Sequence, residues 1–325
     1  MSRFNFFLYI LCFHILYLNG PFIFAQSQNY SSVGSSAGAP FRMGFGARGI
    51  ALGNALSAVR QGDLLGYYNP ALIPFQFEPT LVASYSILSL DRHLNFLSYT
   101  RSLKPNAGLS LSLINAGVGN IDGRNRDGLK TETLNTSENV FSLSFGLHPS
   151  ANFSMGVSAK ILYYLLYEDM KSTSVAIDFG MLYLLTQEVT LAAVVQDINA
   201  KYNWNSTNLY GLQGNDFSDK FPLRYRIGIT YTPIWFGGLI SGEYEFVGTD
   251  KILRFGSEIE VINSFFIRFG IDQIAFNSDL SPIPSFGFEF DVPISTWNTS
   301  FHYTYVIEPF SPSGFHIISF SLRFK

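Results

Sequence analysis

Apolar and polar residues alternate with a period of two through most of the chain after residue 79. The segment 153–161 places Phe153, Met155 and Val157 on one face and Ser154, Gly156 and Ser158 on the other. The same alternation recurs at 225–231, 265–272 and 286–292. Alternation with this period predicts β-strands with one apolar and one polar face, whereas a helix repeats every three to four residues.

The alternating segments are numerous and long. Most span ten residues or more, as a tilted bilayer-crossing strand requires, whereas strands of globular proteins average about five or six residues. The sequence predicts fourteen strands, at 79–90, 92–103, 106–118, 138–148, 151–165, 173–185, 188–198, 221–233, 236–247, 250–262, 264–275, 283–293, 296–308 and 312–325.

The connections between these strands sort by parity. Long connections, at 119–137, 199–220, 276–282 and 309–311, follow odd-numbered strands, although those near 91 and 248–249 are short. Connections after even-numbered strands are mostly tight, as in "KPN" and "HPS". Outer-membrane barrels have short periplasmic turns at one end and longer loops at the other, so this sorting favours a barrel.

Alternation alone does not separate a barrel in lipid from a soluble β-sandwich, because both give the same pattern. Predicted export, strand length, loop parity and the C-terminal strand "HIISFSLRFK", with an aromatic residue before Lys325, favour the membrane. We therefore predict an all-β protein: a 14-stranded antiparallel transmembrane β-barrel in the bacterial cell outer membrane, with lipid as its surroundings.

The N-terminus has the features of an export signal. Arg3 precedes the apolar run "FFLYILCFHILYL", and cleavage after Ala25 predicts a signal peptide at 1–25. The only cysteine, Cys12, lies in this segment, which leaves the exported chain without disulfides or thiolate ligands. The formal net charge of −3, without a basic run, argues against nucleic acid as a partner.

Residues 26–78 are predicted to form a flexible segment, 26–40, followed by a compact plug inside the barrel at 79–325. Gly44, Gly46 and Gly49 match the G-x-G-x-x-G fingerprint of dinucleotide-binding proteins, but no strand precedes them and no βαβ unit follows. We interpret these glycines as sites of close backbone packing. Asn69 and Pro70 predict the start of a short helix.

Several strands carry charged residues on their polar faces, in positions where tight turns would bring opposite charges together. Such pairs stabilise a polar wall, or they line a path for a charged ligand. The predicted lumen charge ladder consists of Arg226, Glu243, Glu245, Arg254, Glu258 and Arg268.

The stretch "GFGARGIALGNALSAV…D…YYNPAL" resembles the N-terminal signature of the PorV/PorQ family, relatives of the FadL-type long-chain fatty-acid transporters. The matching plug motif comprises Gly46, Ala47, Arg48, Gly49, Gly53, Asn54, Asp63, Asn69, Pro70 and Ala71, with Asn54 standing where many members have glycine. The resemblance implies an outer-membrane barrel that assists type IX secretion, with secretion components and sorting-domain cargo as partners. A FadL-like channel for fatty acids or other hydrophobic small molecules remains the alternative.

An outer-membrane enzyme is the competing class. His93, His148, His302 and His316 are scattered, and neither HExxH nor G-x-S-x-G occurs. We therefore predict no enzyme activity, no cofactor and no metal.

Overall fold

The structure is a computed structural model that describes residues 34, 36–63, 66–167, 170–276, 278–294, 297–309, 311 and 313–324. The predicted signal peptide, 1–25, lies outside the described residues, as do residues 26–33 of the segment predicted to be flexible.

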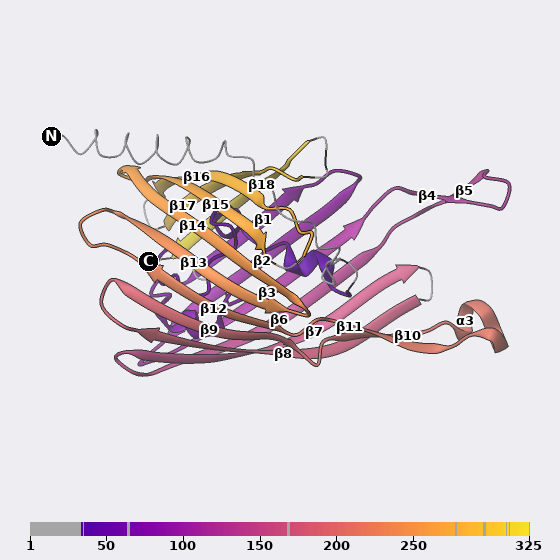
Figure 1. Ribbon diagram of the computed structural model, residues 1–325, viewed down its shortest axis with the longest axis horizontal. Helices are drawn as coiled ribbons and strands as arrows, with labels where there is room; N and C mark the ends of the chain where they lie inside the picture. The colour runs from indigo at the N-terminus through magenta and orange to yellow at the C-terminus, as the bar shows by residue number, and fades with distance from the viewer. Residues whose placement is uncertain are drawn as a thin grey trace.

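Fourteen strands form one closed antiparallel barrel, which confirms the predicted fold class (Figure 1). Each strand pairs with its neighbour along the chain, and β1 closes the ring by pairing with β18, so that Thr80 lies opposite Arg323. The barrel strands are β1 (Thr80–Ile87), β2 (Arg92–Leu103), β3 (Ala107–Val118), β6 (Ser137–Ser150), β7 (Phe153–Tyr167), β8 (Met170–Leu184), β9 (Val189–Ile198), β12 (Arg224–Tyr231), β13 (Gly238–Val247), β14 (Asp250–Ile262), β15 (Phe265–Ala275), β16 (Ile283–Ile294), β17 (Trp297–Val306) and β18 (Phe315–Phe324).

The apolar face of the barrel strands points outward. On β12, Tyr225, Ile227 and Ile229 are each about half exposed, while Arg224 and Arg226, at the alternate positions, are buried. Outward tyrosines and a tryptophan lie toward both ends of the strands, as in the aromatic girdles of membrane barrels: Tyr85, Tyr163 and Tyr225 at one end, Tyr99, Tyr183, Tyr231 and Trp297 at the other. This surface identifies a barrel that sits in the bacterial outer membrane.

Two long connections fold into hairpins where loops were predicted. β4 (Ile121–Arg124) pairs with β5 (Lys130–Leu134), and β10 (Lys201–Asn205) pairs with β11 (Asp216–Lys220), with the short helices α3 (Thr207–Tyr210) and η3 (Gly211–Gln213) between the latter two. Both hairpins extend beyond the same end of the barrel (Figure 1). Because the tight turns lie at the opposite end, we call the hairpin end the outer mouth and the other the periplasmic end.

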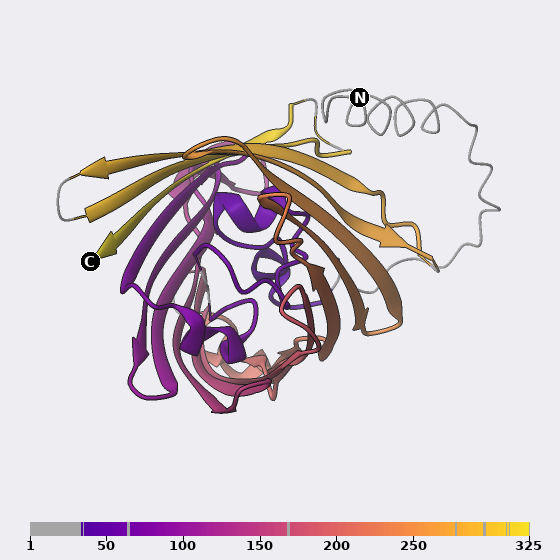
Figure 2. The ribbon, with the colours of Figure 1, turned by 90° about the vertical axis from the view of Figure 1, so that its left-hand side faces the viewer.

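The described residues 36–63 and 66–76, which precede β1, lie inside the ring of strands (Figure 2). They contain η1 (Ala39–Arg42), α2 (Ala47–Ala51) and η2 (Pro70–Phe75), and we call residues 36–76 the plug. Asn69 caps η2 by accepting a hydrogen bond from the Ala71 backbone N–H, as predicted. Within the described residues, no helix has both the length and the apolar character needed to span a bilayer.

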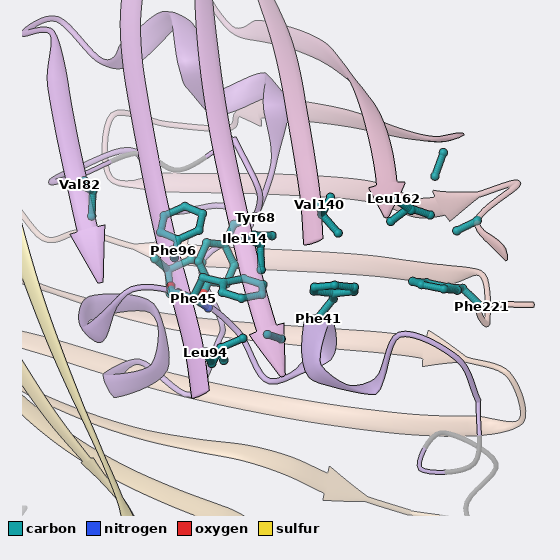
Figure 3. Packing of buried hydrophobic residues seen from close by; sticks show 14 of the residues in the cluster. Phe41, Phe45, Tyr68, Val82, Leu94, Phe96, Ile114, Val140, Leu162 and Phe221 are labelled. Carbon is teal, nitrogen blue, oxygen red and sulfur yellow. Dashed lines mark hydrogen bonds between the residues drawn. The ribbon is translucent and has the colours of Figure 1, made fainter. Parts of the chain in front are cut away.

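The aromatic side chains of the plug pack against the wall formed by β1–β3, β6 and β7 (Figure 3). Phe45 stacks on Phe96 of β2 at a ring-centroid distance of 5.5 Å, and Phe41 stacks on Phe221 near the outer mouth at 6.4 Å. The plug therefore begins near the outer mouth. Its Arg60 reaches the periplasmic turn, where it donates a hydrogen bond to the Gln187 carbonyl oxygen.

Candidate functional site

One side of the lumen is lined by glycines that form a row across four neighbouring strands. The register aligns Gly108 with Gly146, Gly146 with Gly156, and Gly156 with Gly180. The Asn69-Pro70-Ala71 turn lies directly on this row: a Cβ atom on Gly156 would be only 2.4 Å from the Pro70 carbonyl carbon. The absence of side chains in this row allows the plug backbone to approach the wall.

The opposite side of the lumen carries the residues predicted as a charge ladder, all of them buried. Arg226 Nε donates to Glu243 Oε1 at 2.5 Å, and Arg268 Nε donates to Glu258 Oε2 at 2.5 Å. Arg254 pairs with Glu245 and lies 3.6 Å from Glu243. These six side chains thus form two sets, one of Arg226, Glu243, Glu245 and Arg254 on β12–β14 and the other of Glu258 and Arg268 on β14 and β15.

Five further ionisable residues, which the sequence did not predict as part of the ladder, extend these sets: Arg224 and Asp272 the first, and Glu289, His302 and Arg323 the second. Arg224 binds Glu245 at 2.7 Å, and Asp272 accepts from Arg254 at 2.5 Å. Asp272 and Glu289 lie on the polar faces of alternating segments, so the alternation of apolar and polar residues alone indicates that they point inward. Their partners became apparent only from the packing of the strands around the plug.

Two charged residues of the plug motif join the second set. The Arg48 guanidinium donates to both carboxylate oxygens of Glu258, at 2.8 and 2.9 Å. Asp63 accepts from Arg323 Nε at 2.9 Å and lies 3.3 Å from His302 Nε2. The plug is therefore fixed by ion pairs to β14 and β18, and by the contact of Asp63 with His302 to β17.

The turn that contains Asn54 is the third contact between plug and wall. Asn54 has a φ of +62° and donates through Nδ2 to Asp272 at 2.8 Å, and it accepts through Oδ1 from the Tyr68 hydroxyl at 2.8 Å. The adjacent Gly53 lies very close to Gly270 of the wall. A Cβ atom on Gly270 would be 2.1 Å from the Gly53 nitrogen. Asparagine tolerates the left-handed conformation that this turn requires.

Other residues of the plug motif also contact the wall or pack within the plug. Gly46 has a φ of +76° and precedes α2, where the Ala47 N–H donates to Ser319 Oγ at 2.8 Å. Gly49 packs against Tyr68, whose oxygen would be 2.1 Å from a Cβ at that position. In this structure every residue of the plug motif thus lies in the lumen or against its wall.

Asp63 makes docking of the plug sensitive to pH. Burial by itself raises the pKa of Asp63, but Arg323 and hydrogen bonds from His302 and Ser321 outweigh it and hold the pKa well below its ordinary value. The docked form therefore gains stability above the ordinary carboxyl pKa of about 4, and loses it as the pH falls below that value.

We expect the ion conductance of the reconstituted barrel to rise reversibly as the pH falls below about 4. Asp63→Asn keeps the shape but removes the charge, at an expected cost of about 2 kcal/mol to docking. This variant is expected to conduct more at neutral pH and to respond less to acid. An acid response equal to that of the unaltered protein would assign the effect to other carboxylates, such as Glu289.

A cavity of about 170 Å³ lies between the plug and β15–β18, toward the outer mouth. Met43, Ile50, Ile283, Val306 and Phe315 form its apolar lining, and polar side chains complete it: Asn54, Arg92, Asp272, Gln273, Ser285 and Glu308. Arg92 Nη2 lies 3.6 Å from Glu308 Oε2. Within the described parts of the chain, no group of three or more His, Cys, Asp or Glu side chains is placed to hold a metal ion.

Several solved structures have the same fold. The toluene transporter TbuX of Ralstonia pickettii matches with a TM-score of 0.61 over 87% of this chain and 99% of its own, at 12% sequence identity. The toluene transporter TodX of Pseudomonas putida gives 0.60 over 86% and 96%, at 11% identity. A Pseudomonas aeruginosa FadL homologue gives 0.56 over 84% and 97%, at 11% identity.

These matches show that the chain shares its fold with TbuX, TodX and the FadL homologue. No protein-family model and no curated protein matches the sequence. At these identities the likeness concerns the fold alone, and none of the three neighbours is described as a PorV or PorQ protein.

Proposed function

We propose that this protein is an outer-membrane channel for small hydrophobic molecules. The observation that carries the proposal is the cavity between the plug and β15–β18, because it offers an apolar lining just inside the outer mouth. Its volume of about 170 Å³ is similar to that of an engineered apolar cavity of about 150 Å³ that binds benzene. The fold it shares with toluene transporters is consistent with a permeant of this size.

The plug supports the same proposal. It fills the lumen with packed aromatic side chains and buried ion pairs, so an open aqueous path of the porin type does not fit this interior. A solute that enters the cavity from the outer mouth meets apolar side chains of α2 and the wall, among them Ile50 and Val306. A hydrophobic solute gains from these apolar side chains, while Arg92, Asp272 and Glu308 give the cavity a polar side.

The cavity is tested with Ile283→Trp, which fills it from β16. Radiolabelled toluene is the probe, taken up by Gram-negative cells that lack their own hydrophobic-solute channels. We expect uptake to fall about tenfold, because weakening occupancy by about 1.4 kcal/mol is sufficient for that change. The matched control is Phe286→Trp on the same strand, whose side chain points to lipid and is 46% exposed. Equal uptake by both variants and the unaltered protein would refute the cavity as the entry site.

Assistance to type IX secretion is a second candidate, and it rests on the PorV/PorQ resemblance of the plug motif. The two hairpins at the outer mouth favour it further, because Leu129, Tyr210 and Leu212 are strongly exposed on them. Exposed apolar side chains outside the membrane are typical of protein contacts. Deleting residues 206–215 should then abolish co-purification of proteins that carry sorting domains, while leaving toluene uptake unchanged.

A further inference from the structure

Three asparagines form a row on the lipid-facing surface of the barrel. Asn95 of β2, Asn115 of β3 and Asn139 of β6 lie opposite one another in register. Asn95 Nδ2 donates to Asn115 Oδ1 at 3.3 Å, and Asn115 Nδ2 donates to Asn139 Oδ1 at 2.8 Å. The neighbouring outward positions, Leu97 and Leu113, are apolar and exposed. The row is thus a polar stripe within an apolar surface.

A groove of about 270 Å³ runs beside one end of this row. Its floor contains Ala83, whose small side chain stands between Leu97 on β2 and Phe320 on β18. Leu97 and Phe320 are 45% and 51% exposed, so the groove opens on the outer face of the barrel and not into the lumen. Tyr85, Leu113 and Ile318 complete its walls.

Asn95 contributes an unsatisfied acceptor to this groove. Its Nδ2 points to Asn115, and its Oδ1 is buried and receives no hydrogen bond from any described residue. A buried polar atom without a partner is costly, and it is usually paired by water or by a ligand. This face meets lipid, so a lipid group competes with interfacial water for that acceptor.

The position of the row narrows the choice of occupant. Asn95 and Asn115 each lie three residues from the outer end of their strand, or roughly 10 Å along it. This places them near the boundary between acyl chains and head groups in the outer leaflet. An occupant must therefore supply hydrocarbon for the groove and an O–H or N–H donor at that depth.

We propose that this groove binds an amide-linked hydroxyacyl chain of an outer-leaflet glycolipid. The hydrocarbon fills the space above Ala83, and the hydroxyl or amide group donates to Asn95 Oδ1. An ester-linked phospholipid chain fits the same space but offers only carbonyl acceptors at the linkage. The site is independent of the proposed channel activity, because its side chains point away from the lumen.

Native mass spectrometry of the full barrel in detergent tests this proposal, with purified lipid A and a saturated phosphatidylethanolamine as probes. We expect lipid A to bind at least tenfold more tightly than the phospholipid. Ala83→Phe, which fills the groove, and Asn95→Leu, which removes the acceptor, should each remove that preference. The control is Ala159→Phe, another outward alanine, whose register partners Leu143 and Ile177 lie away from the groove.

Each variant is first checked for its heat-modifiable mobility on unboiled gels, which reports a folded barrel. Equal binding of both lipids by the unaltered protein would refute the proposal, and so would lipid A binding that survives Ala83→Phe. A dimer that forms without lipid and is lost in Ala83→Phe would assign the groove to a second copy of the chain instead.

Discussion

Deleting residues 41–72 is expected to turn the closed barrel into an open pore that conducts ions. The barrel strands bond to one another around the full ring, so the wall does not need the plug for its backbone hydrogen bonds. A ring of fourteen strands is close in size to porins of sixteen to eighteen, which contain an aqueous channel. We expect the conductance in planar bilayers, and the uptake of small hydrophilic antibiotics by cells, to rise at least about tenfold.

The matched control removes residues 121–134, the β4–β5 hairpin, which lies outside the lumen (Figure 1). This deletion is expected to leave conductance unchanged. If the barrel without residues 41–72 inserts normally and conducts no more than the complete protein, the plug does not close the lumen. If it fails to insert, plug and barrel are a single folding unit, contrary to the division at residue 78.

Period-two alternation was sufficient to predict the strands, because each strand meets two different solvents, while strand length and loop parity were needed to favour a barrel over a sandwich. Lipid favours large apolar side chains on the outside, and the lumen favours small or polar ones on the inside. The sequence of each strand therefore shows which residues face lipid and which face the lumen. The fourteen predicted strands correspond one to one with the barrel strands. Their ends differ by a few residues; the strand predicted at 221–233, for example, is Arg224–Tyr231, because residue pairing rather than hydrophobicity fixes where a ladder stops.

The hairpins at the outer mouth were missed because neither of their faces meets lipid. β5 and β11 consist largely of exposed polar and charged residues, and a strand in water on both sides has no hydrophobic alternation. The contacts between Asp63 and β18 were missed for another reason. Asp63 and Arg323 are 260 residues apart and meet only because β18 closes the ring beside β1 while the plug lies within it.

The plug motif also explains why its resemblance to PorV and PorQ does not by itself decide the cargo. In this structure Arg48, Asn54 and Asp63 bind wall residues, and Asn69-Pro70-Ala71 lies on wall glycines. Only Asn54 also borders the cavity. The motif therefore describes how a plug is held in a barrel, a requirement that a solute channel and a secretion accessory share. Cargo specificity belongs to the cavity and the hairpins.

The glycine row leads to a prediction that leaves the plug sequence unchanged. Gly156→Val is expected to displace the Asn69-Pro70-Ala71 turn, because the new Cβ would lie 2.4 Å from the Pro70 backbone, which has no rotamer with which to move away. Overpacking of this kind costs about 1–3 kcal/mol. The undocked fraction, measured as channel openings in planar bilayers, should rise by about tenfold to a hundredfold.

Gly242→Val is the matched control, since it places the same side chain on a barrel strand that faces outward. The nearest atom to a Cβ at Gly242 is 3.6 Å away on Phe255, an ordinary contact. Valine also suits a strand in lipid, so this barrel should stay closed. Equal opening by both variants would mean that valine perturbs the wall itself. A closed Gly156→Val barrel would show that the turn does not need the glycine row for docking, because the ion pairs of Arg48 and Asp63 alone would then hold the plug in place.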